Sequence, residues 1–205
     1  MMRGVHALLA WLLATAVSPL HAAAEPPADS LYQMRVELLG QTGAPQPFDL
    51  YRGHPTLVSM FYGSCPATCP MLITGLKVYE QKLPAAGRAR LRVLLISFDA
   101  KRDTPARLTE LAREHHADQV RWTFASASET NARKIAALLG VEYRHLGDGS
   151  FDHSLLITLL DNDGRPLTST SKLIGDSRFQ GKLNAATDSQ SVPVPRENSH
   201  ATANR

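Results

Sequence analysis

The sequence predicts an α/β domain with a mixed central β-sheet, helices on its faces and a C-terminal β-hairpin. Two continuous apolar runs of β-forming residues, 56–62 and 91–99, are typical of strands that are covered on both faces. A helical segment follows each run, which is the alternation expected of an α/β fold. Asp-Asn-Asp-Gly at 161–164 separates two further β-rich segments and predicts a hairpin turn.

The first strand is expected at 31–39, where apolar and polar residues alternate. Pro70 and Pro105 favour the first turns of two helices, and Thr104 is a suitable N-cap for the second. Later elements follow from similar signals: strand 56–62, helix 68–82, strand 91–99, helix 105–116, strand 121–126, a helix from the Ser126–Glu129 capping box to Gly140, and hairpin strands 153–160 and 165–173.

The chain divides into three parts. Residues 1–24 have one early arginine, an apolar run from Ala7 to Val17 and an alanine triplet, which predicts a signal peptide cleaved after Ala24. An uncleaved membrane anchor is the alternative, but the run is shorter than the roughly 20 residues that span a bilayer. The folded domain is expected over 25–180, and a disordered polar tail, without periodicity from about Asp188, over 181–205.

The composition bears on location and partners. The signal predicts a periplasmic or otherwise exported protein that is soluble after cleavage and has no stable membrane anchor. The net charge of +3 is made of interspersed basic and acidic residues, which argues against nucleic acid as a partner.

Both cysteines of the chain, Cys65 and Cys69, lie between a buried strand and a helix. A structural disulfide is one interpretation, but the loop-entropy model gives so short a ring only about 2 kcal/mol. A helix N-terminus favours thiolate over thiol, the form needed for both disulfide exchange and metal binding. Two thiolates suit Cu(I), especially with an imidazole as third ligand.

Among the histidines, His153 stands where a glycine-rich loop enters an apolar strand. Neighbouring strands would bring it near the turn at 63–69 that holds Cys65 and Cys69, which we call the cysteine turn. A hydrogen-bonded histidine at a strand end is an equal alternative from position alone. His115 and His116 are a poor chelating pair because adjacent helical residues face different sides. His54 is expected to be a solvated turn residue, and the sequence does not assign a role to His145.

Three segments occur in an informative order: MFYGSCPATCPML at 60–72, ISFDAKRDTPARL at 96–108 and FDHSLLITLLDNDG at 151–164. Over roughly residues 45–170 the chain resembles the Sco/SenC family, thioredoxin-like copper chaperones linked to assembly of the binuclear copper site (CuA) of cytochrome c oxidase. The resemblance implies a thioredoxin-like fold, a copper site of Cys65, Cys69 and His153, and a supporting role for Asp99. Ala67 stands where the family usually carries an acidic residue.

The leading hypothesis is therefore a copper metallochaperone that carries Cu(I), Cu(II) or both. Its expected partners are a copper-accepting protein, such as a cytochrome c oxidase subunit, and a thiol reductant or copper donor protein. The alternative is a thiol–disulfide oxidoreductase with Cys65 and Cys69 as its redox pair, Cys65 being the attacking thiol. A thioredoxin-like peroxidase is a third possibility without positive support in the sequence.

Signal cleavage leads to a simple prediction. The protein recovered from the exported fraction should have the intact mass of a chain that begins at Glu25, because the alanine triplet ends the leader. A membrane-bound species that retains Met1 to Ala24 would show an anchor instead.

Overall fold

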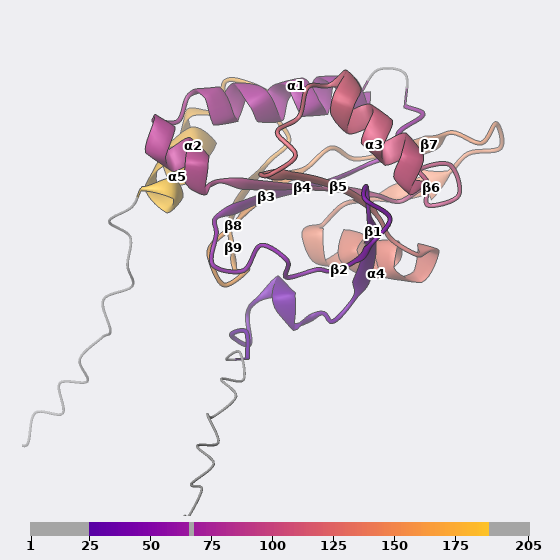
Figure 1. Cartoon of the computed structure of the whole chain (residues 1–205), viewed down its shortest axis with the longest axis horizontal. Helices are drawn as coiled ribbons and strands as arrows, with labels where there is room; N and C mark the ends of the chain where they lie inside the picture. The colour runs from indigo at the N-terminus through magenta and orange to yellow at the C-terminus, as the bar shows by residue number, and fades with distance from the viewer. Residues whose placement is uncertain (1–24, 66–67, 189–205) are drawn as a thin grey trace, which may run out of the picture.

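The computed structural model describes residues 25–65 and 68–188, except the side chains of Thr68 and Cys69 (Figure 1). The signal segment expected over 1–24, part of the cysteine turn (66–67) and the end of the predicted tail (189–205) lie outside the described residues.

A seven-stranded mixed sheet forms the centre of the domain, in the spatial order β2-β1-β5-β4-β3-β8-β9. Its central strands β3, β4 and β5 are parallel, whereas β1, β2, β8 and β9 join by antiparallel pairing. The strands are β1 (Glu37–Gly40), β2 (Pro45–Pro47), β3 (Thr56–Phe61), β4 (Arg92–Ser97), β5 (Trp122–Ser126), β8 (Ile157–Leu160) and β9 (Pro166–Thr170).

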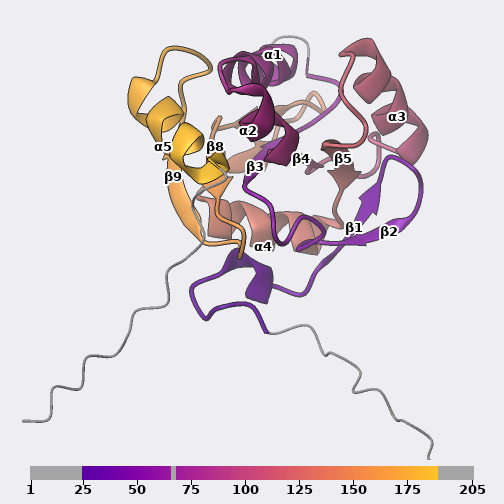
Figure 2. The ribbon, with the colours of Figure 1, turned by 60° about the vertical axis from the view of Figure 1, so that its left-hand side comes forward.

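Helices cover both faces of this sheet, as the sequence predicts (Figures 1 and 2). α1 and α3 lie over one face and α4 over the other, while α2 and α5 pack together beside α1. The helices are α1 (Thr68–Gln81), α2 (Ala85–Arg90), α3 (Pro105–Glu114), α4 (Glu129–Leu139) and α5 (Ser177–Thr187). Within the described ranges, no helix has the length and apolarity needed to cross a membrane.

The predicted buried strands are confirmed. All six residues of β3 are buried, and only the first residue of β4 is partly exposed. In the parallel register Phe61 pairs with Ser97, and Ser97 pairs with Ser126. The three strands therefore end together, and the segments that follow β3 and β4 leave the sheet from the same edge.

Two helix termini agree with the sequence and one cap differs. The Thr104 hydroxyl accepts the Arg107 N–H (3.4 Å), and Gly140 ends α4 with a left-handed φ of 71°. The predicted cap Ser126 was wrong because that residue completes β5, where it pairs with Ser97. Ser128 is the N-cap of α4 and accepts the Asn131 N–H (3.3 Å).

The N-terminal strand is shorter than predicted. Leu31–Gln33 form a 3-10 helix, η1, in which the Ser30 hydroxyl accepts the Tyr32 N–H (3.0 Å). Leu31 and Tyr32 are both buried, so alternation does not describe these two residues. From residue 33 to 39 exposed and less exposed residues do alternate, as predicted. The strand itself begins only at Glu37.

The segment predicted as one strand over 153–160 is divided. β8 begins at Ile157 and forms the predicted hairpin with β9. His153 belongs to a separate strand, β7 (Phe151–His153), which pairs with β6 (Tyr143–His145) in a two-stranded sheet. The β6–β7 hairpin projects from the end of the domain at which α1 begins (Figure 1).

The predicted domain boundary at residue 180 was wrong because α5 continues through residues 181–187. Asp176 caps this helix by accepting the Phe179 N–H (2.9 Å). Phe179, Leu183 and Thr187 are buried at helical spacing and place α5 within the core. The helical pattern of these positions is weak in the sequence, because small and polar residues separate them.

Removal of the Leu183 side chain should test this correction. Leu183→Ala should lower the free energy of unfolding by about 2–4 kcal/mol, because it leaves a cavity under α5. Leu138→Ala on α4 is the matched control. Leu138 is 48% exposed, so this variant should lose much less free energy of unfolding. Equal losses in urea denaturation would mean that α5 does not contribute to the core.

Candidate metal centre

Cys65 lies just beyond the end of β3. Its backbone N–H donates to the Tyr62 carbonyl (3.2 Å), which turns the chain back toward α1. The side chain is 9% exposed, at the margin of the core. Cys69 is the second residue of α1, whose first turn holds no acidic residue. The positive end of the helix dipole therefore acts on the cysteine segment without a neutralising carboxylate in that turn.

The structure brings His153 to the same edge. Its ring lies edge-on to Tyr62, with 5.6 Å between ring centroids, and 5.4 Å from the ring of Phe98. Tyr62 thus contacts His153 through its ring and holds Cys65 through its carbonyl. The predicted proximity of the histidine to the cysteine turn is present, although His153 reaches it from β7 rather than from the start of β8.

One nitrogen of His153 has a backbone partner. Nδ1 is 3.2 Å from the Ser154 carbonyl oxygen, which can only accept a hydrogen bond. Nδ1 must therefore carry the proton in this contact, which leaves the lone pair of a neutral ring on Nε2. Metal-binding histidines commonly have this arrangement, in which the second nitrogen donates to a carbonyl and fixes the ring.

An aromatic cluster supports the histidine. Phe98 stacks on Tyr143 with 4.6 Å between ring centroids, and Phe151 meets Tyr62 at 5.1 Å and Phe98 at 5.0 Å. These rings come from the segments after β3 and β4 and from the β6–β7 hairpin. The cluster attaches the hairpin to the end of the main sheet.

Asp103 fixes the start of the cysteine turn. Its Oδ2 accepts hydrogen bonds from the Gly63 N–H (2.7 Å) and from the Ser97 hydroxyl. The side chain is only 1% exposed, and burial raises the pKa of its carboxyl, against the opposing effect of these two hydrogen bonds. Asp103 lies within the segment 96–108 that carries the family resemblance, but no role was predicted for it. Its position between a buried strand and a capped helix was the one sequence signal that this carboxylate could be buried and hydrogen-bonded.

Position 63 has no room for a side chain, so a glycine is required there. A Cβ at this position would contact the Asp103 carboxylate and lie 2.7 Å from Leu111 Cδ1. Both neighbours are buried, so neither could move away cheaply. The glycine lets the backbone approach Asp103 closely enough to donate its N–H.

Asp99 extends the same polar network to the hairpin. It forms an ion pair with Arg102, and its N–H donates to the Ser97 hydroxyl (2.9 Å). Arg102 in turn donates to the Gly149 carbonyl (2.6 Å) and lies 5.7 Å from the centroid of the Phe151 ring. A connected set of contacts therefore runs from the cysteine turn to the hairpin that carries His153, and it gives the predicted supporting residue Asp99 a specific structural role.

The other histidines belong to different surroundings. His115 is the C-cap of α3, and its carbonyl accepts a hydrogen bond from Lys77. Burial, followed by the Lys77 charge, lowers the pKa of His115. His54 precedes β3, at the strand end opposite Cys65. Within the described parts of the chain, no three His, Cys, Asp or Glu side chains form a metal-binding group. The Cys69 side chain is outside the described structure.

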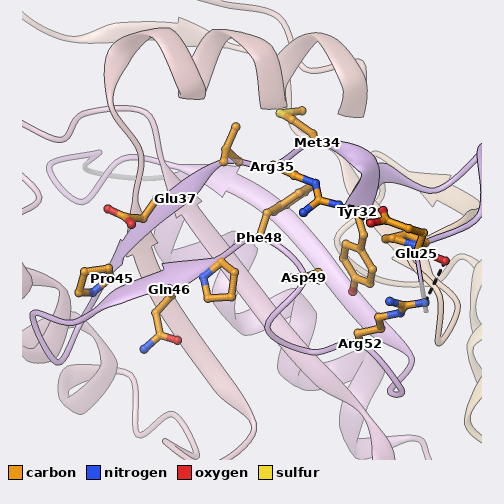
Figure 3. Close-up of a pocket in the computed structure, with 13 residues that line it drawn as sticks. Glu25, Tyr32, Met34, Arg35, Glu37, Pro45, Gln46, Phe48, Asp49 and Arg52 are labelled. Atoms are coloured by element: carbon orange, nitrogen blue, oxygen red, sulfur yellow. Dashed lines mark hydrogen bonds and ion pairs between the residues drawn. The ribbon is translucent and has the colours of Figure 1, made fainter. Parts of the chain in front are cut away.

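A cavity of about 500 Å³ lies beside η1, β1 and β2 (Figure 3). Acidic and basic side chains are mixed around it, and Arg52 donates a hydrogen bond to the Glu25 carbonyl across one end (3.4 Å). Neither Cys65 nor His153 lines this cavity. Its lining residues include no cysteine, histidine, serine or threonine, and the thioether of Met34 is the one soft metal ligand among them.

Comparisons with known proteins identify the family to which this chain is similar. The SCO1/SenC family model matches residues 24–188. A protein of Stutzerimonas stutzeri whose name assigns it copper binding is 25% identical over 134 residues. That match covers 63% of this chain and 64% of the relative, so the chain matches just under two thirds of the relative's length.

Solved structures show the same fold. ScoI of Bradyrhizobium japonicum with copper bound has a TM-score of 0.62 at 23% identity, over 74% of this chain and 97% of that one. BsSco, described as a member of the Sco family of cytochrome c oxidase assembly proteins and as having a disulfide switch, has a TM-score of 0.64 at 16% identity, with coverages of 80% and 97%. The predicted thioredoxin-like α/β fold is confirmed.

The raised pKa of Asp103 predicts how stability changes with pH. A carboxyl whose pKa is higher in the folded than in the unfolded chain stabilises the fold most when protonated, and this contribution falls as pH rises. Asp103→Asn keeps an oxygen acceptor but does not titrate. The free energy of unfolding of the Asp103→Asn variant minus that of the native protein should therefore increase as the pH rises from below 3.8 toward neutrality.

Asp176→Asn is the control with the opposite sign. The Phe179 N–H and the Thr170 hydroxyl lower the pKa of Asp176, so its contribution is present above pH 3.8 and is lost in acid. Urea denaturation across this pH range measures both differences. Parallel pH profiles for the two variants would contradict the account of Asp103.

Proposed function

The chain belongs to the SCO1/SenC family, and we propose that it is a copper metallochaperone of an exported compartment, with Cys65, Cys69 and His153 as its copper ligands. The observation that carries the proposal is the placement of His153. Its Nδ1 meets a backbone carbonyl, and its ring lies against Tyr62, which holds the cysteine turn. These contacts leave Nε2 of the neutral ring available as a ligand at the sheet edge from which the Cys65 segment leaves.

The donor set suits copper as a cargo. Thiolates are soft ligands that favour Cu(I), and an imidazole nitrogen adds affinity for Cu(II). Copper in the relatives supports this choice of metal, since ScoI of B. japonicum has been solved with copper bound. Three ligands at the edge of a sheet leave a position from which an incoming thiolate of an acceptor could begin ligand exchange.

Each part of the site has a task in this proposal. The N-terminus of α1 favours deprotonation of the cysteines. Asp103 and Gly63 set the direction in which the chain leaves β3. Arg102 holds the hairpin so that His153 meets the turn in a constant orientation. Copper exchange then requires motion of side chains only, without rearrangement of the sheet.

The CuA site of a cytochrome c oxidase subunit is the acceptor we propose. Support comes from the description of BsSco as a member of a family of oxidase assembly proteins. The signal-like segment at 1–24 supports an exported location, where such an acceptor domain could be reached.

A thiol–disulfide oxidoreductase is the second candidate, and the disulfide switch described for BsSco favours it. In this reaction the Cys65 thiolate attacks an acceptor disulfide and forms a mixed disulfide, releasing one acceptor thiolate. Cys69 then attacks Cys65, so the acceptor is reduced to a dithiol and this chain is oxidised to a disulfide. His153 has no required part in that exchange, which separates the two functions.

Copper titration of the reduced protein tests the proposal. One copper ion should bind per chain, and Cys65→Ser or Cys69→Ser should abolish tight binding. His153→Ala should weaken Cu(II) binding more than Cu(I) binding, because two thiolates can still hold Cu(I) in linear geometry. His54→Ala, at the other end of β3, is the matched control and should bind both ions like the native protein.

The same variants also measure disulfide exchange. His153→Ala should reduce a model disulfide at the native rate, since both sulfurs remain. If this variant binds both copper states as tightly as the native protein, His153 is not a ligand, and the oxidoreductase should replace the chaperone as the proposed function.

A further inference from the structure

A cavity of about 800 Å³ lies behind the aromatic cluster, between the β4–α3 loop, the start of α4 and the β6–β7 hairpin. Its aromatic residues are those that hold the hairpin to the sheet, and its charged rim is mainly basic. The lining residues on which the argument depends are Phe98, Lys101, Arg102, Arg133, Tyr143 and Arg144. We call this space the basic cavity.

The charge of the basic cavity is unbalanced. Four lysine and arginine side chains line it, against two carboxylates, Asp99 and Glu129. A third carboxylate, Asp152, lies outside the lining and pairs with Arg144 (3.0 Å).

Within the described structure, Lys101 makes no ion pair and is exposed at the rim. Its charge still acts on Glu129, because the hydrogen bond and charge of Arg133, and then the charge of Lys101, lower the pKa of that carboxyl. Arg133 pairs with Glu129 at the surface, where such a pair is weak and exchangeable. The cavity therefore attracts negative charge.

A buried hydroxyl in the basic cavity lacks a partner. Tyr143 Oη is inaccessible to solvent, and no group of the described residues forms a hydrogen bond with it. Burial raises the pKa of Tyr143, so the hydroxyl remains a donor at neutral pH. Arg133 and Glu129 are the charged groups that act on it. An unsatisfied buried donor is costly, and an acceptor that reached it would recover that cost.

The basic cavity continues toward the candidate metal ligand. A neighbouring hollow of about 420 Å³ shares Tyr143 and Arg144 with it and is lined by His153. Phe98 also contacts both the Tyr143 ring and the His153 ring. A polypeptide segment seated in the basic cavity would therefore lie beside His153.

We propose that the basic cavity docks an acidic segment of the protein that receives the copper. A carboxylate of that segment lies between Lys101 and Arg133. Once the side chains that cover Tyr143 Oη move aside, this carboxylate accepts a hydrogen bond from it. An apolar side chain beside it packs on Phe98. The aromatic residues of the lining and the volume of the cavity fit a peptide better than a single inorganic anion. This inference rests on the proposed function, because it takes the docked protein to be the one that receives the copper.

Peptide binding to the copper-free, reduced protein tests the inference. The probe is a fluorescein-labelled hexapeptide of alternating glutamate and phenylalanine, measured by fluorescence anisotropy. The same peptide with glutamine for glutamate should bind at least about tenfold more weakly. Added salt should lower the affinity of the acidic peptide, because it screens the charges. Lys101→Gln combined with Arg133→Gln should lower its affinity about tenfold or more. Tyr143→Phe should lower it roughly threefold to tenfold.

Lys134→Gln combined with Lys182→Gln is the matched control. It removes the same charge from exposed positions on α4 and α5 that do not line the basic cavity, and it should leave the affinity unchanged. Equal weakening in both double variants would overturn the proposal in favour of attraction by net charge. Binding of citrate as tight as that of the peptide would overturn it in favour of a small-anion site.

Copper titration of the same variants keeps the two proposals separate. Native-like copper loading by the Lys101/Arg133 double variant, with weakened peptide binding, is the expected result. Normal copper loading with no peptide binding to the native protein would overturn the docking inference alone. Peptide binding without copper loading would contradict the metallochaperone function and leave an acidic-peptide site.

Discussion

The parallel register of β3 with β4 is the constraint on which the rest of the site depends. Phe61 pairs with Ser97, so the chain leaves both strands at the same level of the sheet. The Phe98 N–H donates to the Phe61 carbonyl (3.1 Å) and continues this alignment beyond the last paired residues. A slip of one residue would turn each side chain to the opposite face of the sheet. Asp103 could then no longer meet Gly63, and the cysteine turn would lose its fixed start.

From this edge, polar and aromatic contacts perform different tasks. The Asp103, Ser97, Asp99 and Arg102 contacts fix directions, because hydrogen bonds and ion pairs depend on geometry. The rings of the cluster supply the buried area that keeps a short two-stranded hairpin attached, since such hairpins are marginal alone. Together they place His153 beside Tyr62. The same hairpin forms one wall of the basic cavity, so metal binding and partner docking would share a single support.

Sequence patterns predicted the parts of the fold that local chemistry determines. The apolar runs of β3 and β4, the Thr104 cap and the Gly140 terminus each follow from the residues at that position. The β6–β7 hairpin could not be predicted in this way, because it depends on rings that come from distant segments. Likewise α5 is stabilised by burial of Leu183 rather than by a strong helical pattern. For the site, Cys65 and His153 were indicated by residue type and motif, whereas the tasks of Asp103 and Arg102 appear only when Gly63 and Gly149 lie beside them.

The central claim is that the edge defined by β3 and β4 assembles one copper site from the cysteine segment and the β7 histidine. X-ray absorption spectroscopy of the native protein loaded with one equivalent of copper tests it most directly, because sulfur and nitrogen ligands scatter differently. The account predicts two sulfur ligands and at least one imidazole nitrogen for Cu(II). A coordination shell made only of nitrogen and oxygen would contradict it, since the copper would then lie away from Cys65 and Cys69.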